Sequence, residues 1–322
     1  MTAPRSPSLA VEVAGLRLKN PLIAASGTFG YGVEYEGLLE LSTLGGLVSK
    51  GLYMEPRDGC ATPRIAETPS GLLNAIGLQG VGVRAFVKDV MPRLARHDTA
   101  VLVNVCGDTV DEYAEVTRVL DGVPGVAGVE INISCPNVKK GGMAFGGDPR
   151  MTHEVVSAVR KATRLPVIPK LSPNVGDITV FARAAEEAGA DALSCINTLL
   201  GLAIDVETRR PKLAFGTGGL SGPAIRPVAV RMTWQAARAV KIPILGIGGI
   251  SSAADVLEFM IAGARAVQIG TANFVDPGVY DRVLAGLREY LERHHIADIN
   301  EIVGTVQFPE SRPAPAVAGA EG

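Results

Sequence analysis

Short runs rich in valine, isoleucine and leucine alternate with longer amphipathic stretches along almost the whole chain. Eight runs have strand character: residues 21–26, 46–51, 100–105, 128–134, 166–172, 192–197, 243–249 and 266–272. Stretches of helical character lie between most of them, including residues 111–120, 178–190, 227–240 and 252–264. Strands and helices in this alternation form a parallel sheet, and eight such units close into a barrel. The sequence therefore predicts an α/β fold, a single (β/α)8 TIM barrel.

Two connections are longer than ordinary loops between a strand and a helix. They span residues 50–80 and 197–227, and each follows the C-terminal end of a predicted strand. Active sites of such barrels are built at that end, so we expect inserted loops or strands there. Residues 1–307 are predicted to form one domain, and the Pro/Ala-rich residues 308–322 a disordered tail.

Composition excludes several classes of partner. The formal net charge is −2 and no Lys/Arg stripe occurs, which argues against nucleic acid and anionic membrane surfaces as partners. Neither a signal peptide nor a run of ~20 uncharged apolar residues is present, so we expect a cytoplasmic protein. The four cysteines and four histidines have no metal-ligand spacing, and no metal site is predicted.

Polar side chains interrupt the predicted strands near their C-terminal ends, where parallel strands covered on both faces should be apolar. These side chains belong to Lys50, Asn104, Asn132, Lys170 and Asn197. Strand alternation sets Asn132 opposite Ile131 and Ile133, so its amide should point into the barrel. One such residue would be interpreted as a hydrogen-bonded structural group, but five at one end indicate a site. Buried lysines are costly without partners, so both should meet an anionic or electron-rich group.

Glycine-rich segments follow the last two predicted strands, at residues 246–250 and 269–272. Barrels commonly bind phosphate at this position through backbone N–H groups and a helix N-terminus. Ser251 and Ser252, at a predicted helix start, would contribute to such a site. Another close-approach loop lies at residues 218–222. Sugar-phosphate isomerases and barrels of tryptophan biosynthesis share this pattern, so a flavin-free phosphate-binding barrel without redox activity remains an alternative.

A set of motifs resembles dihydroorotate dehydrogenase, the flavin enzyme of pyrimidine biosynthesis. The motifs run in order from about Asn20 to Val303: "ASGTFG" (25–30), "EPRDGCATPRIAETPSGLLNAIGLQG" (55–80), "NISCPNV" (132–138), "KLSPNV" (170–175), "GGLSGPAIRP" (218–227), "GIGGI" (246–250) and "VQIGTA" (267–272). The cysteine at position 135, within "NISCPN", resembles that of the soluble class 1 enzymes, which have cysteine in this motif. Within class 1 the chain looks most like the NAD-linked type 1B catalytic subunit, although Gly80 stands where relatives often have asparagine.

The resemblance implies oxidation of (S)-dihydroorotate to orotate, with hydride transfer to one bound FMN per chain, in de novo UMP biosynthesis. Electrons would pass to NAD⁺ through a partner subunit that carries FAD and a [2Fe–2S] cluster, in a heterotetramer with a homodimer core. This chain has no G-x-G-x-x-G after a strand, so NAD⁺ would be used on the partner. Two enzymatic alternatives are a fumarate-dependent type 1A homodimer and a dihydropyrimidine dehydrogenase-like protein.

The resemblance also assigns binding residues. FMN would be held by Ser26, Lys50, Gly51, Asn104, Asn132, Lys170, Ile196, Gly222, Gly248, Gly249, Gly270 and Thr271, the last four around its phosphate. Dihydroorotate would be held by Lys50, Asn74, Ala75, Ile76, Gly77, Leu78, Asn132, Asn197 and Thr198. The amides suit the pyrimidine ring because each offers both a donor and an acceptor.

By the same resemblance, Cys135 would be the catalytic base and Lys50 would pair with the substrate carboxylate. Lys170 would stabilise the anionic reduced flavin. The glycines at positions 141, 142, 146 and 147 would form a mobile lid. The other cysteines, Cys60, Cys106 and Cys195, are interpreted as bystanders.

Overall fold

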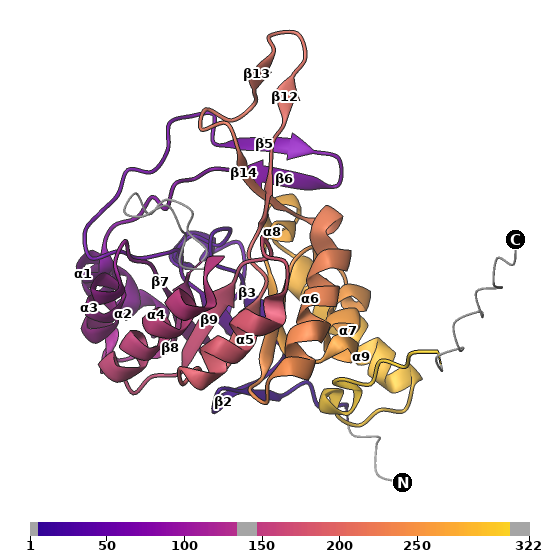
Figure 1. Cartoon of the computed structure of the whole chain (residues 1–322). Helices are drawn as coiled ribbons and strands as arrows, with labels where there is room; N and C mark the ends of the chain where they lie inside the picture. The colour runs from indigo at the N-terminus through magenta and orange to yellow at the C-terminus, as the bar shows by residue number, and fades with distance from the viewer. Residues whose placement is uncertain (1–5, 134–146, 310–322) are drawn as a thin grey trace, which may run out of the picture.

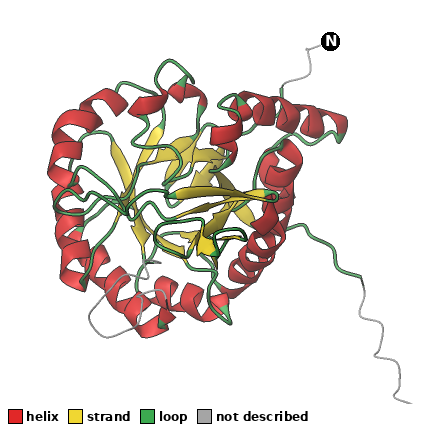
Figure 2. Cartoon of the chain, turned by 90° about the horizontal axis from the view of Figure 1, so that it is seen from above, coloured by secondary structure: helices red, strands yellow, loops and turns green. Residues whose placement is uncertain are grey.

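The computed structural model of this chain describes residues 6–133 and 147–309, and a closed barrel of parallel strands lies at its centre (Figures 1 and 2). The barrel strands follow the order β10-β15-β16-β3-β4-β7-β8-β9. Their bounds are β3 Leu22–Ala24, β4 Gly46–Val48, β7 Ala100–Val105, β8 Val126–Asn132, β9 Val167–Leu171, β10 Leu193–Cys195, β15 Ile244–Ile247 and β16 Ala264–Ile269. Each overlaps one predicted run, so the predicted (β/α)8 barrel is confirmed.

Helices surround the strands as a ring when the barrel is viewed from above (Figure 2). The longer ones are α3 Val110–Leu120, α4 Pro149–Ala162, α5 Ile178–Glu187, α6 Arg226–Ala239, α7 Ala253–Ala262 and α9 Val279–Arg293. A further helical stretch runs through α1 Val83–Ala85, a π-helical segment Phe86–Val90 and α2 Met91–Leu94. Short turns are α8 Ala272–Val275 and the 3₁₀ segments Val33–Tyr35, Leu41–Thr43, Pro223–Ile225 and Ile299–Ile302.

Local sequence explains where several of these helices begin. The side chains of Thr109, Asp148 and Asp177 each accept a hydrogen bond from a backbone N–H in the first turn of α3, α4 and α5. Such a cap satisfies a donor that the helix cannot, and is typically worth about 1 kcal/mol. The helices then bury their apolar faces against the barrel strands, and in β9 all five residues are buried, Lys170 among them.

The two long connections meet above the C-terminal end of the barrel. Residues 50–80 contribute β5 Ile65–Thr68 and β6 Gly71–Asn74, and residues 197–227 contribute β11 Leu199–Gly201 and β14 Gly218–Ser221. These four strands form one antiparallel sheet in the order β11-β14-β6-β5. A hairpin of β12 Ile204–Asp205 and β13 Arg210–Pro211 projects beyond it (Figure 1). The expected inserted strands are therefore present at the expected face.

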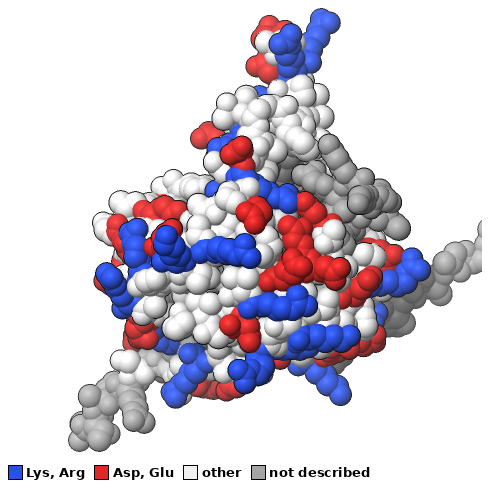
Figure 3. All heavy atoms as spheres, turned by 90° about the vertical axis from the view of Figure 1, so that its left-hand side faces the viewer, with Lys and Arg blue, Asp and Glu red and all other residues white. Residues whose placement is uncertain are grey.

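The opposite end carries the hairpin of β1 Val11–Val13 and β2 Leu16–Leu18. Near the end of the described chain, the Phe308 ring packs 5.1 Å from the Trp234 ring between centroids. Residues 310–322 lie outside the described part, so the division into a domain of residues 1–307 and a tail of residues 308–322 stays a prediction. Acidic and basic side chains are interspersed on the face that Figure 3 shows. Among the helices of residues 6–133 and 147–309, none combines the length and apolar character that a membrane crossing needs.

Candidate active site

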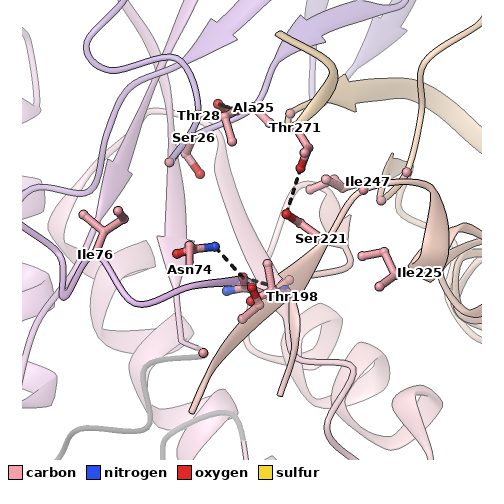
Figure 4. Close-up of a pocket in the computed structure, with 18 of the residues that line it drawn as sticks. Ala25, Ser26, Thr28, Asn74, Ile76, Thr198, Ser221, Ile225, Ile247 and Thr271 are labelled. Atoms are coloured by element: carbon pink, nitrogen blue, oxygen red, sulfur yellow. Dashed lines mark hydrogen bonds between the residues drawn. The ribbon is translucent and has the colours of Figure 1, made fainter. Parts of the chain in front are cut away.

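A cavity of about 580 Å³ opens at the C-terminal end of the barrel, between the strand ends and the antiparallel sheet (Figure 4). This volume lies within the usual range of small-molecule sites. Every residue that the family resemblance assigns to FMN or dihydroorotate lines this one cavity. Cys135 and the glycines at positions 141, 142 and 146 lie outside the described residues, so their roles stay predictions.

Glycines form one end of the cavity, where the chain comes close to itself. Gly248 and Gly249 follow β15 with positive φ angles of 133° and 75°. A Cβ atom added at Gly248 would lie 2.7 Å from the Cβ of Ala229, and one at Gly249 would lie 2.8 Å from the carbonyl oxygen of Gly222. Only glycine fits both positions without a shift, and the bare backbone there can closely approach a ligand. This end therefore suits a phosphate group.

Two serines expected at that end have other partners. The backbone N–H groups of Ser251 and Ser252 each donate to Oδ2 of Asp255 at 2.9 Å, and the Ser251 hydroxyl donates to the same oxygen at 3.1 Å. Asp255 thus caps α7 from within its own first turn. A carboxylate thus already accepts from these N–H groups, and a contribution of the two serines to phosphate binding stays a prediction.

A hydrogen bond between Thr271 and Ser221 joins two segments beside the glycine end of the cavity. Thr271 follows β16, and its hydroxyl donates to Oγ of Ser221 at 2.8 Å, as Figure 4 shows. Ser221 ends β14, so this bond ties the antiparallel sheet to the barrel. Gly270 precedes Thr271, and both line the cavity.

Lys50 extends from the loop that follows β4. Within the part of the chain that the structure describes, its ammonium has no hydrogen-bond or ion-pair partner. Burial lowers the pKa of Lys50 below its ordinary value, the negative charge of Glu34 partly opposes this, and the positive charge of Arg64 adds to it. A half-buried cation in a cavity wall is suited to an anionic ligand.

Three asparagine side chains line the cavity as well, those of Asn74, Asn132 and Asn197. Oδ1 of Asn132 accepts from Nδ2 of Asn197 at 3.3 Å, and Oδ1 of Asn197 accepts from the backbone N–H of Thr198 at 2.8 Å. Nδ2 of Asn74 donates to the Gly219 carbonyl at 3.3 Å (Figure 4). The inward direction of Asn132 that strand alternation predicts is confirmed, because Asn132 lines the cavity. The amides offer donors and acceptors to a planar polar ligand.

Glu130 is the main residue that sequence reasoning missed. It lies on β8 two positions before Asn132, so the same alternation would have turned it inward. Its side chain is fully buried, with Oε1 3.7 Å from Nζ of Lys170. The anionic partner expected for Lys170 is thus supplied by the protein itself.

Helix α9 and the turn before it contribute residues that no motif indicated. Arg282, on α9, lines the cavity and forms an ion pair with Asp276, which follows α8. Phe215, from the long second connection, lines it as well. Their place in the cavity depends on the closure of the barrel, which brings residues from distant parts of the chain together.

The other cysteines differ in their surroundings. Burial raises the pKa of Cys195 to about 12, so this thiol stays protonated and suits the interpretation as a bystander. Cys106 is fully buried, and its thiol lies 3.6 Å from Oδ1 of Asn104. Cys60 lines the cavity, which its sequence context did not predict. Among the described residues, no group of three or more His, Cys, Asp or Glu side chains is placed to hold a metal ion.

Comparison with known proteins gives one family. The family model for dihydroorotate dehydrogenase matches residues 8–291. Proteins named "dihydroorotate dehydrogenase B (NAD(+)), catalytic subunit" are similar over nearly the full length. The one from Geotalea uraniireducens is 56% identical over 300 residues, covering 93% of this chain and 98% of the relative. The one from Desulforudis audaxviator is 59% identical over 295 residues, covering 92% and 96%. The one from Geobacter sulfurreducens is 56% identical over 303 residues, covering 94% and 99%.

Proposed function

The chain belongs to the dihydroorotate dehydrogenase family, and we propose that its cavity oxidises (S)-dihydroorotate to orotate in pyrimidine biosynthesis, with NAD⁺ as the final acceptor. The relatives that cover it almost end to end are named as NAD⁺-linked catalytic subunits of this enzyme. One observation carries the proposal: a single cavity is lined by a glycine-rich end, a lysine without a partner in the described chain, and converging amides.

We propose that the cavity holds one FMN. The glycines at positions 248, 249 and 270 suit its phosphate because their backbone leaves room for close approach. Lys170, Asn104 and Ser26 line the same cavity and would contact the ring system. When bound, the flavin supplies the hydride acceptor.

Lys50 and the amides would hold and orient the substrate. A carboxylate is the natural partner for the Lys50 ammonium in a half-buried wall. The ring imide would alternate donors and acceptors against Asn74, Asn132 and Asn197, whose amides offer both. Thr198 and the backbone from Ala75 to Leu78 would complete the enclosure. Such positioning fixes the ring carbon that loses hydride against the acceptor.

Cys135 is proposed as the base on the strength of its motif, three positions after Asn132 in the chain. Its thiolate would take a proton from the ring methylene beside the carbonyl. The carboxylate-bearing carbon would lose hydride, and the electron pair left by the departing proton would form the double bond of orotate. Positioned proton transfer of this kind typically contributes ~10²–10⁴-fold to a rate.

Electron transfer to NAD⁺ would take place on a second subunit. The relatives are named catalytic subunits, which implies a separate subunit, and the chain itself has no G-x-G-x-x-G after a strand. We propose that this partner carries FAD and a [2Fe–2S] cluster and that a homodimer of the present chain forms the core of a heterotetramer. We also place the complex in the cytoplasm.

Anaerobic mixing of the purified chain with dihydroorotate tests the chemistry. The flavin absorbance should bleach. A colourless protein that binds no added FMN would contradict a redox function and favour a flavin-free phosphate-binding barrel. Adding NAD⁺ with and without the copurified subunit then tests the acceptor. Turnover should require that subunit, whereas fumarate turnover by the isolated chain would favour a type 1A homodimer.

A further inference from the structure

Glu130 is a carboxylate enclosed behind the cavity wall. Its Oε1 accepts from Nδ2 of Asn104 at 2.8 Å and from the Ser26 hydroxyl at 3.2 Å. Its Oε2 accepts from the Ser194 hydroxyl at 2.8 Å and from Nε2 of Gln268 at 2.6 Å. These four bonds fill the acceptor capacity of a carboxylate. The carboxylate is therefore held in place through both of its oxygens.

The two oxygens face different surroundings. Ser26 and Asn104, which meet Oε1, both line the cavity, whereas Ser194 and Gln268, which meet Oε2, belong to the packed interior of the barrel on β10 and β16. One carboxylate thus connects the barrel interior to the wall of the proposed flavin site. Its loss would leave several donors without their acceptor.

Lys170 is held by the same oxygen. Nζ of Lys170 lies 3.7 Å from Oε1 of Glu130 and donates to the Ser26 hydroxyl at 3.3 Å, which in turn meets Oε1. The Lys170 side chain is only 8% exposed and that of Glu130 is 0% exposed. In such a dry environment the negative charge offsets much of the field of the ammonium.

We propose that Glu130 is a positioning residue that orients Ser26, Asn104 and Lys170 and lowers the reduction potential of the bound flavin by offsetting the charge of Lys170. The proposal rests on the proposed function, since it requires FMN in the cavity. A lysine that is paired with a carboxylate stabilises a reduced, anionic flavin less than an unpaired lysine would. The carboxylate therefore makes the reduced flavin a stronger electron donor to the next acceptor.

The test compares midpoint potentials of the flavin-loaded protein, measured anaerobically by stepwise reduction beside a reference dye. Glu130→Gln keeps the shape of the side chain and removes its charge, so the potential should shift to a more positive value. Ser194→Ala is the matched control, because it removes one hydrogen bond to Glu130 but leaves the charge. Its shift should be clearly smaller. An unshifted Glu130→Gln, or equal shifts in both variants, would overturn the proposal.

Two further variants separate the charge effect from a loss of structure. Glu130→Asp keeps the charge but shortens its reach, so its potential should lie between those of the wild type and Glu130→Gln. This variant also serves if Glu130→Gln does not fold with flavin, and an Asp variant with wild-type potential would then overturn the proposal. In a Lys170→Gln background, Glu130→Gln should shift the potential less, and an undiminished shift would exclude action through Lys170.

The wild-type protein separates this inference from the proposed function. Absence of flavin binding by the wild type contradicts the proposed function itself. A yellow, dihydroorotate-reducible wild type whose potential is unaffected by Glu130→Gln contradicts only the role of Glu130.

Discussion

At the scale of single residues, the proposed site depends on a cation and a thiol whose protonation governs binding and chemistry separately. Lys50 must carry a proton to attract the substrate carboxylate. Cys135 must lose one to accept a proton from the substrate. Rising pH therefore favours the chemical step until it weakens the binding step, and the two effects can be measured apart.

The pH dependence of orotate binding tests Lys50. Burial lowers its pKa, so the ammonium loses its charge at a lower pH than a free lysine would. The charged form exists below that pKa, and orotate affinity should therefore fall as pH rises through it. Orotate titrations of the flavin absorbance at increasing alkaline pH measure this.

Lys50→Gln should bind orotate roughly 10–100-fold more weakly at neutral pH, as expected for the loss of a hydrogen bond to a charged group. It should also lose the alkaline fall in affinity. Lys241→Gln is the control, because that lysine is exposed in the connection between α6 and β15 and does not line the cavity. An unchanged alkaline fall in Lys50→Gln would assign it to another group.

Cys135→Ala tests the proposed base. The variant should retain FMN and bind orotate, but dihydroorotate should reduce its flavin ~10²–10⁴-fold more slowly at neutral pH. A free thiol has a pKa of about 8.5, so wild-type flavin reduction should accelerate towards that pH and the variant should not. Anaerobic stopped-flow absorbance measures both rates. Cys60→Ala, which removes a thiol that lines the cavity, should keep the acceleration, and equal rates in wild type and Cys135→Ala would exclude the base.

At the scale of elements, alternation along strand β8 predicted the inward direction of Asn132 but not the partners of Glu130, which lies on the same strand. Glu130 meets side chains from five other segments of the barrel, which are distant in sequence and come together only on closure. The pairing of β6 with β14 likewise joins segments that are far apart in the sequence, since Leu73 pairs with Leu220. The two long connections were recognisable as insertions, whereas their union into one sheet was not.

The phosphate end shows a different limit of sequence reasoning. Glycines at strand ends predicted a close approach, and the positive φ angles of Gly248 and Gly249 agree. The serines at the start of α7 looked equally suitable, but the Asp255 side chain competes for their N–H groups. A local motif cannot show which of two acceptors a backbone donor will take.

Gly249→Ala tests this end of the cavity. Its added Cβ would lie 2.8 Å from the Gly222 carbonyl at a φ of +75°, so the glycine loop must shift. FMN affinity should fall, measured by flavin fluorescence on titration into apoprotein. Gly122→Ala is a matched control, because Gly122 has a φ of +78° and open space around its Cβ position. Both variants carry similar backbone strain, so equal affinities in the two would contradict a phosphate site at Gly249.

At the scale of the whole molecule, the cavity joins the barrel strands to the antiparallel sheet, so a ligand that fills it holds two parts of the fold together. A ligand that binds only the native state stabilises it by RT ln(1 + [L]/Kd). The strands of the sheet come from connections that begin at Lys50 and Asn197, and both residues line the cavity. Loading with FMN should therefore stabilise the entire chain against unfolding.

Adding FMN to apoprotein at about 100 times its Kd should raise the free energy of unfolding by about 2.7 kcal/mol. Riboflavin carries the same ring system without the phosphate, so at the same concentration it should stabilise less if the glycine end binds phosphate. Chemical denaturation followed by tryptophan fluorescence measures both, since Trp234 lies on α6, away from the cavity lining. Equal stabilisation by the two ligands would mean that the phosphate contributes no binding energy, and the glycines at positions 248, 249 and 270 would then need another role.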